Sequence, residues 1–176
     1  MKQVKVALIG AGYIADYHAR GLQSVPGVEI VAIAAGSPES AGKFAAKYGI
    51  PVATDDALSL AGRNDIDAVV IATPNKFHAP HAIEFLKNGK DVFLEKPMAM
   101  SAEEGLTVKA AAEENNRVVM VGHMWRFDTD VNYVKSVIEE GKLGKIIKTK
   151  GYGIHENWGP AGWFANKELA GGGALA

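Results

Sequence analysis

The 176-residue sequence predicts an α/β fold with a doubly wound parallel sheet. Short runs of β-branched and aliphatic residues alternate with longer segments whose apolar residues recur at helical spacing, as in successive βαβ units. A glycine-rich turn from Gly10 to Ala15 directly follows the first run and opens a helical segment. Hydrophobic residues make up 48% of the chain, which is enough to bury a core at this length.

The alternation predicts the individual elements in order. We expect strands at 4–9, 28–34, 68–72, 92–94 and 118–121, with a weaker strand near Val52. Apolar spacing predicts helices over 14–25, 38–48, 56–61, 77–88 and 102–115. Capping residues support several of these limits, because Ser37 and Ser101 stand at helix starts and Gly49 and Gly89 at helix ends.

The alternation stops after Gly122, which predicts a domain boundary there. Residues 1–122 would form the first domain, and 123–176 the incomplete start of an α+β second domain. In this second part we expect one helix near 130–140 and a strand over 145–154.

Composition excludes several classes of function. The formal net charge of −1 gives no basic surface for nucleic acid or anionic lipid, so neither is expected as a partner. No apolar stretch approaches the roughly 20 residues that a membrane helix needs. The absence of cysteine excludes disulfides and thiolate metal sites. Because the first strand begins at Val4, we expect no signal peptide and a cytoplasmic location.

The turn Gly10-Ala11-Gly12-Tyr13-Ile14-Ala15 has the context of a dinucleotide-binding Rossmann fingerprint, between a strand and a helix. Gly10 would permit the tight turn, and Gly12 would let a pyrophosphate approach bare backbone at the helix N-terminus. The alternatives are a glycine-rich turn without a ligand, or the similar loop of an adenosyl-methionine methyltransferase.

The end of the second expected strand bears on the choice between NADP and NAD. Enzymes that select NAD usually place a carboxylate about 20 residues after the glycines, where it binds the ribose 2′-hydroxyl. Here the strand is followed by Ala35-Gly36-Ser37, without a carboxylate. Ser37 could donate a hydrogen bond to a 2′-phosphate, which favours NADP, although no arginine accompanies it. Alternatively, Ser37 is only the cap of the following helix.

Four further segments carry a family resemblance: Thr73-Pro74-Asn75, His78, Glu95-Lys96-Pro97 and Gly171-Gly172-Gly173-Ala174-Leu175. With the glycine turn, and in this order, they resemble the Gfo/Idh/MocA oxidoreductases from Val4 to the last residue. The resemblance implies hydride transfer between a nicotinamide coenzyme, NADP or NAD, and a sugar, cyclitol or related polyol or carbonyl compound. It also implies a homo-oligomer when the protein is full length.

Lys96 is the residue that we expect to be catalytic. It follows a strand at the carboxyl edge of the sheet, where ligands bind in open parallel sheets, and Pro97 restricts its backbone. Its ammonium could bond the reacting oxygen while hydride moves. The alternatives are a solvated surface charge or a phosphate contact. In the family the Lys96–Pro97 peptide is often cis, and we expect Glu95 to position Lys96 or a ribose.

By the same resemblance, Thr73, Pro74, Asn75 and His78 line the coenzyme near its pyrophosphate and nicotinamide ribose. His78 and His81 are spaced as a metal pair could be, but no third ligand is evident and the family uses no metal.

Four further positions toward the end of the sequence are candidates for the site, two of them by the resemblance. Arg126 is expected to touch coenzyme or substrate, or else to hold two domains together. Trp163 is expected to pack beside the coenzyme, with a buried core tryptophan as the alternative. His155 and Glu156 could point into a sugar pocket.

The glycine run near the end of the sequence leaves open whether the chain is catalytic. In the family it leads into an Asp and a His that serve the reacting hydroxyl, and this sequence stops at Ala176 before them. A non-catalytic NAD(P)-binding or sensor module is therefore the main alternative. Another chemistry on the same scaffold is a further one.

Overall fold

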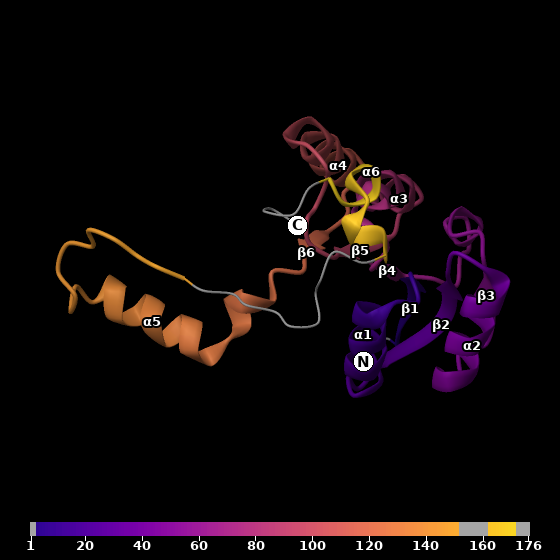
Figure 1. The fold of residues 1–176 in the computed structure, drawn as a ribbon. Coiled ribbons are helices and arrows are strands. Elements are labelled where there is room, and N and C mark those ends of the chain that lie inside the picture. The colour runs from indigo at the N-terminus through magenta and orange to yellow at the C-terminus, as the bar shows by residue number, and fades with distance from the viewer. Residues whose placement is uncertain (1–2, 152–161, 172–176) are drawn as a thin grey trace. The chain divides into compact units, whose positions relative to one another are not determined.

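Six strands form one parallel sheet in the computed structural model, which describes residues 3–151 and 162–171. They are β1 (Val4–Ile9), β2 (Val28–Ala34), β3 (Val52–Thr54), β4 (Ala68–Ile71), β5 (Asp91–Leu94) and β6 (Val119–Val121). Their order in the sheet is β3-β2-β1-β4-β5-β6, and every neighbouring pair is parallel (Figure 1). The doubly wound Rossmann fold predicted from the sequence is confirmed.

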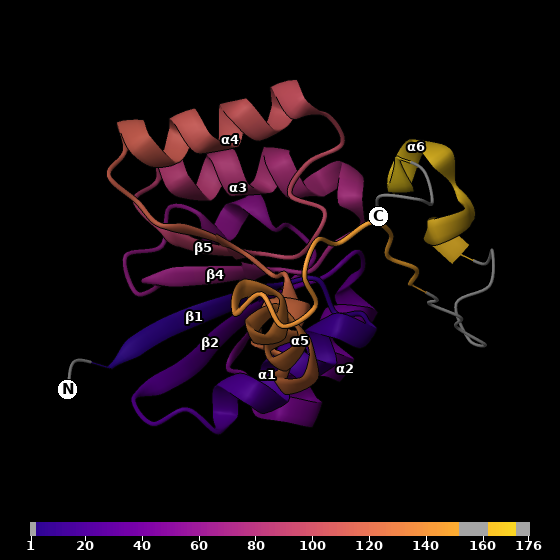
Figure 2. The ribbon, with the colours of Figure 1, turned by 90° about the vertical axis from the view of Figure 1, so that its left-hand side faces the viewer.

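Helices cover both faces of this sheet. The helices α1 (Tyr13–Gln23) and α2 (Pro38–Tyr48) lie on one face, and α3 (His78–Lys87) and α4 (Ala102–Glu114) on the other, as Figure 2 shows. Each face has its own core, because alternate residues of a strand point to opposite sides. Along β1, Val6 and Leu8 pack toward α1 and α2, whereas Ala7 and Ile9 pack toward α3 and α4.

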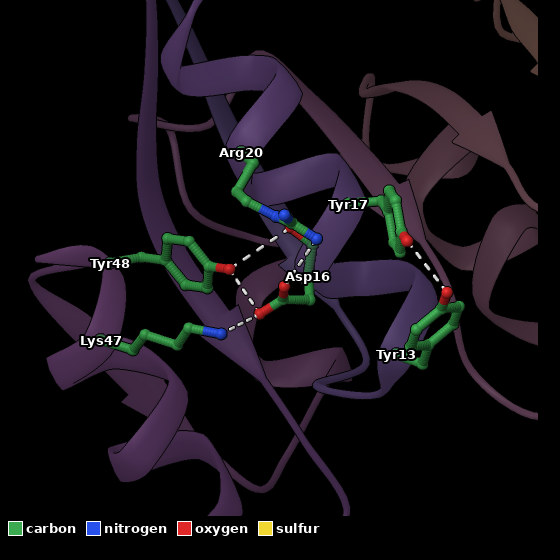
Figure 3. A network of polar contacts seen from close by, with 6 residues as sticks. All are labelled: Tyr13, Asp16, Tyr17, Arg20, Lys47 and Tyr48. Carbon is green, nitrogen blue, oxygen red and sulfur yellow. Dashed lines mark hydrogen bonds and ion pairs between the residues drawn. The ribbon is translucent and has the colours of Figure 1, made fainter.

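The small buried residues of α1 bring that helix close to the sheet. Ala15 and Ala19 are almost fully buried, and both belong to the core on the side of α1 and α2. The helix is also held from the side by Asp16, whose carboxylate contacts Lys47 and the Tyr48 hydroxyl at the end of α2 (Figure 3). These hydrogen bonds, first the one from Lys47, lower the pKa of Asp16. They fix the helix that begins at the glycine turn.

Caps set the limits of the helices as the sequence predicts. The Ser37 hydroxyl accepts the Ser40 N–H at the start of α2, and the Ser101 hydroxyl accepts the Glu104 N–H at the start of α4, both at 3.2 Å. Gly49 ends α2 in the left-handed region with φ 68°.

Two expected elements differ in the structure. Of the helix expected over 56–61, only a 3₁₀ turn, η1 (Leu58–Leu60), is present. The Asp56 carboxylate accepts the N–H groups of Leu58 and Ser59, and the segment is too short to add α-helical turns. The strand expected over 145–154 is absent from residues 145–151, and 152–154 lie outside the described residues. A strand needs a neighbouring strand, and the described part of the chain pairs none with it.

The chain packs as two units. One comprises residues 1–122 together with 163–176, and the other comprises 123–162. The second unit contains the short turn η3 (Met124–Phe127) and α5 (Thr129–Glu139), which Asp128 caps. The short helix α6 (Lys167–Ala170), expected to lie in the second domain, packs with the first unit. Within residues 3–151 and 162–171, no helix is long and apolar enough to cross a membrane.

Candidate active site

Three turns meet at the carboxyl edge of the sheet. They follow β1, β4 and β5, which are adjacent parallel strands, and they contain Gly10, Thr73 and Lys96 respectively. The strand order reverses between β1 and β4, because the chain passes from β1 outward to β3 before returning to β4. Open α/β sheets bind their ligands at this reversal, outside the carboxyl ends of the strands.

Gly10 brings the turns after β1 and β4 into direct contact. Its backbone has φ +110°, and a Cβ atom at this position would lie 2.3 Å from the Ala72 carbonyl oxygen. On the other side, the Gly10 N–H donates to the Ala34 carbonyl at 2.7 Å. The position therefore accepts only glycine, as the fingerprint predicts.

The N-terminus of α1 is open. Gly12 is its N-cap and makes no side-chain capping hydrogen bond, so the first N–H groups of the helix have no side-chain acceptor there. A Cβ on Gly12 would meet nothing within 4 Å among the described residues. The Tyr13 ring is exposed and its hydroxyl pairs with that of Tyr17 at 2.9 Å (Figure 3), while Ile14 is half-buried. This open cradle of N–H groups fits a pyrophosphate.

Ala35 and Ser37, which follow β2, have different surroundings in the structure. Ala35 is buried, and its N–H donates to the Thr54 carbonyl at the end of β3, 3.0 Å away. Ser37 is the cap of α2, in agreement with the simpler alternative. Its oxygen accepts the helix N–H, so the hydroxyl proton remains available to a ligand.

Lys96 is the second residue after β5 and is half-buried. The Lys96–Pro97 peptide is cis, as the resemblance implies. Glu95 holds the turn from within: its Oε2 accepts the Lys96 N–H at 3.1 Å, and its Oε1 accepts Nε2–H of His18 from α1 at 2.8 Å. Glu95 thus contacts the backbone of Lys96, which is one of the two roles expected for it.

The charge state of Glu95 follows from these contacts. Burial alone would raise its pKa, but the hydrogen bond and charge of His18, together with the Lys96 N–H, outweigh burial and hold the pKa below its ordinary value. The carboxylate is therefore ionised at neutral pH.

Acid should destabilise the fold through Glu95. Because its pKa in the folded chain lies below the ordinary 4.5, the unfolded state binds the proton first as the pH falls. The stabilisation is complete above the unfolded-state pKa and is lost as the pH falls through the folded-state pKa. We expect the difference in unfolding free energy between the wild-type chain and Glu95→Gln to shrink between about pH 7 and about pH 3 in urea titrations. A difference that stays constant over this range would contradict the assignment.

Two polar side chains of the turn after β4 contact backbone carbonyls of the chain itself. Asn75 is buried and donates from Nδ2 to the Ala170 carbonyl at the end of α6, at 2.8 Å. His78 is 1% exposed, and its ring nitrogens lie 2.6 Å from the Pro97 carbonyl and 2.9 Å from the Thr73 carbonyl. Each side chain thus contacts a backbone carbonyl in the folded chain. A coenzyme contact by Thr73, Pro74, Asn75 and His78 stays a prediction.

The remaining predicted positions lie on other elements. Arg126 is exposed on η3, in the unit of residues 123–162. Trp163 is 38% exposed on η4 (Gly162–Ala165), so it is not the buried core tryptophan of the alternative, and its ring packs edge-on against Phe164. His155 and Glu156 lie outside the described residues.

His18 is the site residue that sequence reasoning missed. It lies on α1, 77 positions before Glu95, and its ring also packs edge-on against Phe93 of β5. The available signal was the acidic residue at the edge of the sheet, because a half-buried carboxylate requires a donor.

Known proteins resemble this chain in its Rossmann part. The sequence profile of the Gfo/Idh/MocA group, described as an oxidoreductase family with an NAD-binding Rossmann fold, matches residues 4–123. A 4-carboxy-2-hydroxymuconate-6-semialdehyde dehydrogenase from Sphingobium sp. is 38% identical over 140 residues, which cover 80% of this chain and 44% of the relative. The chain thus spans about half the length of such curated relatives.

Two solved structures are similar to the fold. One is scyllo-inositol dehydrogenase from Lactobacillus casei with bound NAD(H) and scyllo-inositol, with TM-score 0.76 and 27% identity over 82% of this chain and 43% of that one. The other is a mutant of KijD10, a 3-ketoreductase from Actinomadura kijaniata, in complex with TDP-benzene and NADP, with TM-score 0.76 and 27% identity over 82% of this chain and 45% of that one. The chain belongs to the Gfo/Idh/MocA family of oxidoreductases with an NAD-binding Rossmann fold.

Proposed function

We propose that this chain is the coenzyme-binding part of an NAD(P)-dependent oxidoreductase that transfers hydride between nicotinamide and a sugar, cyclitol or related polyol or carbonyl compound. One observation carries the proposal. The open N-terminus of α1 and Lys96 lie at the same edge of the sheet, in turns that follow β1 and β5 on the two sides of β4. An anion cradle and a cation able to bond a reacting oxygen are thereby brought together.

The residues of the chain divide the work. Gly10, Gly12 and the first N–H groups of α1, including that of Ile14, would hold the pyrophosphate. Lys96 would donate a hydrogen bond to the substrate oxygen and stabilise its negative charge as the carbon–hydrogen bond breaks or forms. The nicotinamide, when bound, supplies the hydride acceptor or donor. Glu95 would position Lys96 by accepting the hydrogen bond of the Lys96 backbone N–H.

The relatives support this class of substrate and reaction. One acts on a semialdehyde and another holds scyllo-inositol with NAD(H), so the reacting groups are a carbonyl and a secondary hydroxyl. Both are dehydrogenases, and none of the comparisons favours the non-catalytic alternative. A cytoplasmic location, self-association, and coenzyme contacts by Arg126 and Trp163 stay predictions.

For the coenzyme we propose NADP in preference to NAD. The end of β2 carries no carboxylate, and the free hydroxyl proton of Ser37 suits a 2′-phosphate. The test is to titrate the chain with NADPH and NADH and to follow the fluorescence of its three tryptophans. We expect both to bind, NADPH about tenfold more tightly. Turnover, here and below, is that of a protein that carries this chain together with a substrate-binding part, and we expect it to reduce NADP⁺ with scyllo-inositol or a related polyol. Failure of both coenzymes to bind would defeat the proposed function.

Ser37→Asp is the sharper form of this test. Aspartate caps a helix as well as serine does, so the fold is preserved, while the new charge repels a 2′-phosphate and can accept from a 2′-hydroxyl. We expect the preference to reverse by at least about tenfold. Ser101→Asp makes the same change at the cap of α4 and should leave it unaltered. A wild-type preference for NADH would instead point to Asp55 and Asp56, which follow β3.

A further inference from the structure

The residues on both sides of Lys96 are each held by a histidine. On the N-terminal side, Nε2 of His18 donates to the Glu95 carboxylate at 2.8 Å. On the C-terminal side, Nδ1 of His78 lies 2.6 Å from the Pro97 carbonyl oxygen. The three-residue turn that carries Lys96 is therefore fixed at its first and last residue.

The two histidines come from opposite layers of the fold. His18 belongs to α1 and His78 is the first residue of α3, and Figure 2 shows these helices on opposite faces of the sheet. The turn after β5 is thus held from both faces. A turn held in this way cannot tilt toward either helix layer without losing a hydrogen bond.

On the side of α3, the His78 ring lies between two turns. Its two nitrogens face the carbonyl oxygens of Pro97 and of Thr73, and a carbonyl oxygen can only accept. The buried ring thereby lies between the turn after β4 and the turn after β5, and a proton on Nδ1 joins it to the carbonyl of Pro97.

On the side of α1, the carboxylate of Glu95 is enclosed. One oxygen accepts from His18 and the other from the Lys96 N–H. A Cβ on Gly122, just after β6, would lie 3.0 Å from Oε1, so the backbone of the neighbouring strand end also limits the carboxylate. A displacement of the His18 ring therefore acts on Glu95 and, through it, on the backbone of Lys96.

We propose that His18 and His78 are positioning residues for Lys96, which clamp the turn around it so that its ammonium meets the substrate oxygen from a fixed backbone. This rests on the proposed function, because it requires Lys96 to be the group that acts. The advantage is entropic, since a reacting group held close to its working geometry loses little freedom in the transition state.

The clamp can be tested without turnover, by amide hydrogen exchange and ¹H–¹⁵N NMR of the 176-residue chain. We expect an N–H signal from Nδ1 of His78, hydrogen-bonded to the Pro97 carbonyl. The Lys96 amide should exchange at least about tenfold faster in His18→Phe, with recovery in His18→Gln, whose amide nitrogen replaces Nε2. A His78 ring without a proton on Nδ1, or unchanged exchange in His18→Phe, would overturn the respective half of the clamp.

The contacts of the two ring nitrogens of His78 can be tested one at a time by a matched pair of variants. Asparagine places its amide nitrogen near the position of Nδ1 and can keep the bond to Pro97, whereas glutamine places it near Nε2 and can keep only the bond to Thr73. We expect His78→Gln to lower kcat for scyllo-inositol about tenfold, with NADPH affinity within twofold, and His78→Asn to lower it less. His81→Gln, one helical turn later on α3, is the control with wild-type kcat.

Failure of this inference differs from failure of the proposed function. If Lys96→Met loses turnover while the His18 and His78 variants keep wild-type kcat, the clamp is rejected and the function stands. If Lys96→Met turns over normally, the catalytic role of Lys96 is rejected, and with it the clamp as a positioning device. If neither coenzyme binds, the function itself is rejected, and hydrogen exchange at Lys96 alone then decides whether the histidines hold the turn.

Discussion

Gly10→Ala is expected to lower the free energy of unfolding by about 3 kcal/mol and to abolish coenzyme binding. The new Cβ would lie 2.3 Å from the Ala72 carbonyl oxygen, and the backbone at φ +110° is unfavourable for any L side chain. Relief requires the turn after β1 to move away from β4, next to the hydrogen bond that the Ala72 N–H donates to Ile9. Urea unfolding and NADPH titration measure the two effects.

Gly12→Ala is the matched control for this prediction. At Gly12 a Cβ meets nothing among the described residues, and φ is −86°, so the unfolding free energy should change by less than about 0.5 kcal/mol. Coenzyme affinity should nevertheless fall, because the methyl group covers the helix N-terminus where the pyrophosphate is expected. Equal stability losses in the two variants would contradict the distinction.

Lys96→Met is expected to lower kcat by a factor of about 10² to 10⁴ while NADPH affinity changes less than about threefold. Methionine keeps most of the side-chain length but has no ammonium, so the substrate oxygen loses the group that stabilises its charge. The measurement is initial-rate kinetics with NADP⁺ and scyllo-inositol, on the variant that also carries a substrate-binding part, together with direct coenzyme titration of the 176-residue chain. The expected signature is a loss in kcat rather than in coenzyme binding.

The control for Lys96→Met is Lys76→Met. Lys76 is an exposed lysine in η2 (Asn75–Phe77), in the turn after β4. Its replacement should leave kcat within about twofold. Similar losses in both variants would mean that Lys96 contributes only general positive charge at this edge.

The fold could be predicted because its signals are local. The run at 4–9 alternates between two buried faces, and the segment 38–48 carries its own cap, so both elements have the limits that the sequence predicts. The strand expected over 145–154 depends on a neighbour instead, and β-branched residues such as Ile146 and Ile147 do not provide one. Strand formation is in this sense a property of the pair, which one segment does not encode.

The candidate site was predictable to the same extent. The spacing of Gly10 and Gly12 and the position of Lys96 after a strand are local patterns, and both lie at the carboxyl edge. The contacts that hold them are long-range: Glu95 meets His18 from 77 positions away, and Asn75 meets Ala170 from 95 positions away. Contacts of Asn75 and His78 with backbone carbonyls depend on segments far apart in the sequence, so only the folded chain reveals them.

The tight crossing of Gly10 and Ala72 has a consequence for protein engineering. The turn after β1 is in direct contact with another segment of backbone and leaves no room for a side chain at Gly10, whereas the end of β2 carries a half-exposed cap, Ser37. On the proposal that Ser37 contacts the 2′-phosphate, a designer who wishes to change the coenzyme would begin at Ser37. The contact between Gly10 and Ala72 would stay unchanged in every such redesign, because both turns need it to keep their positions.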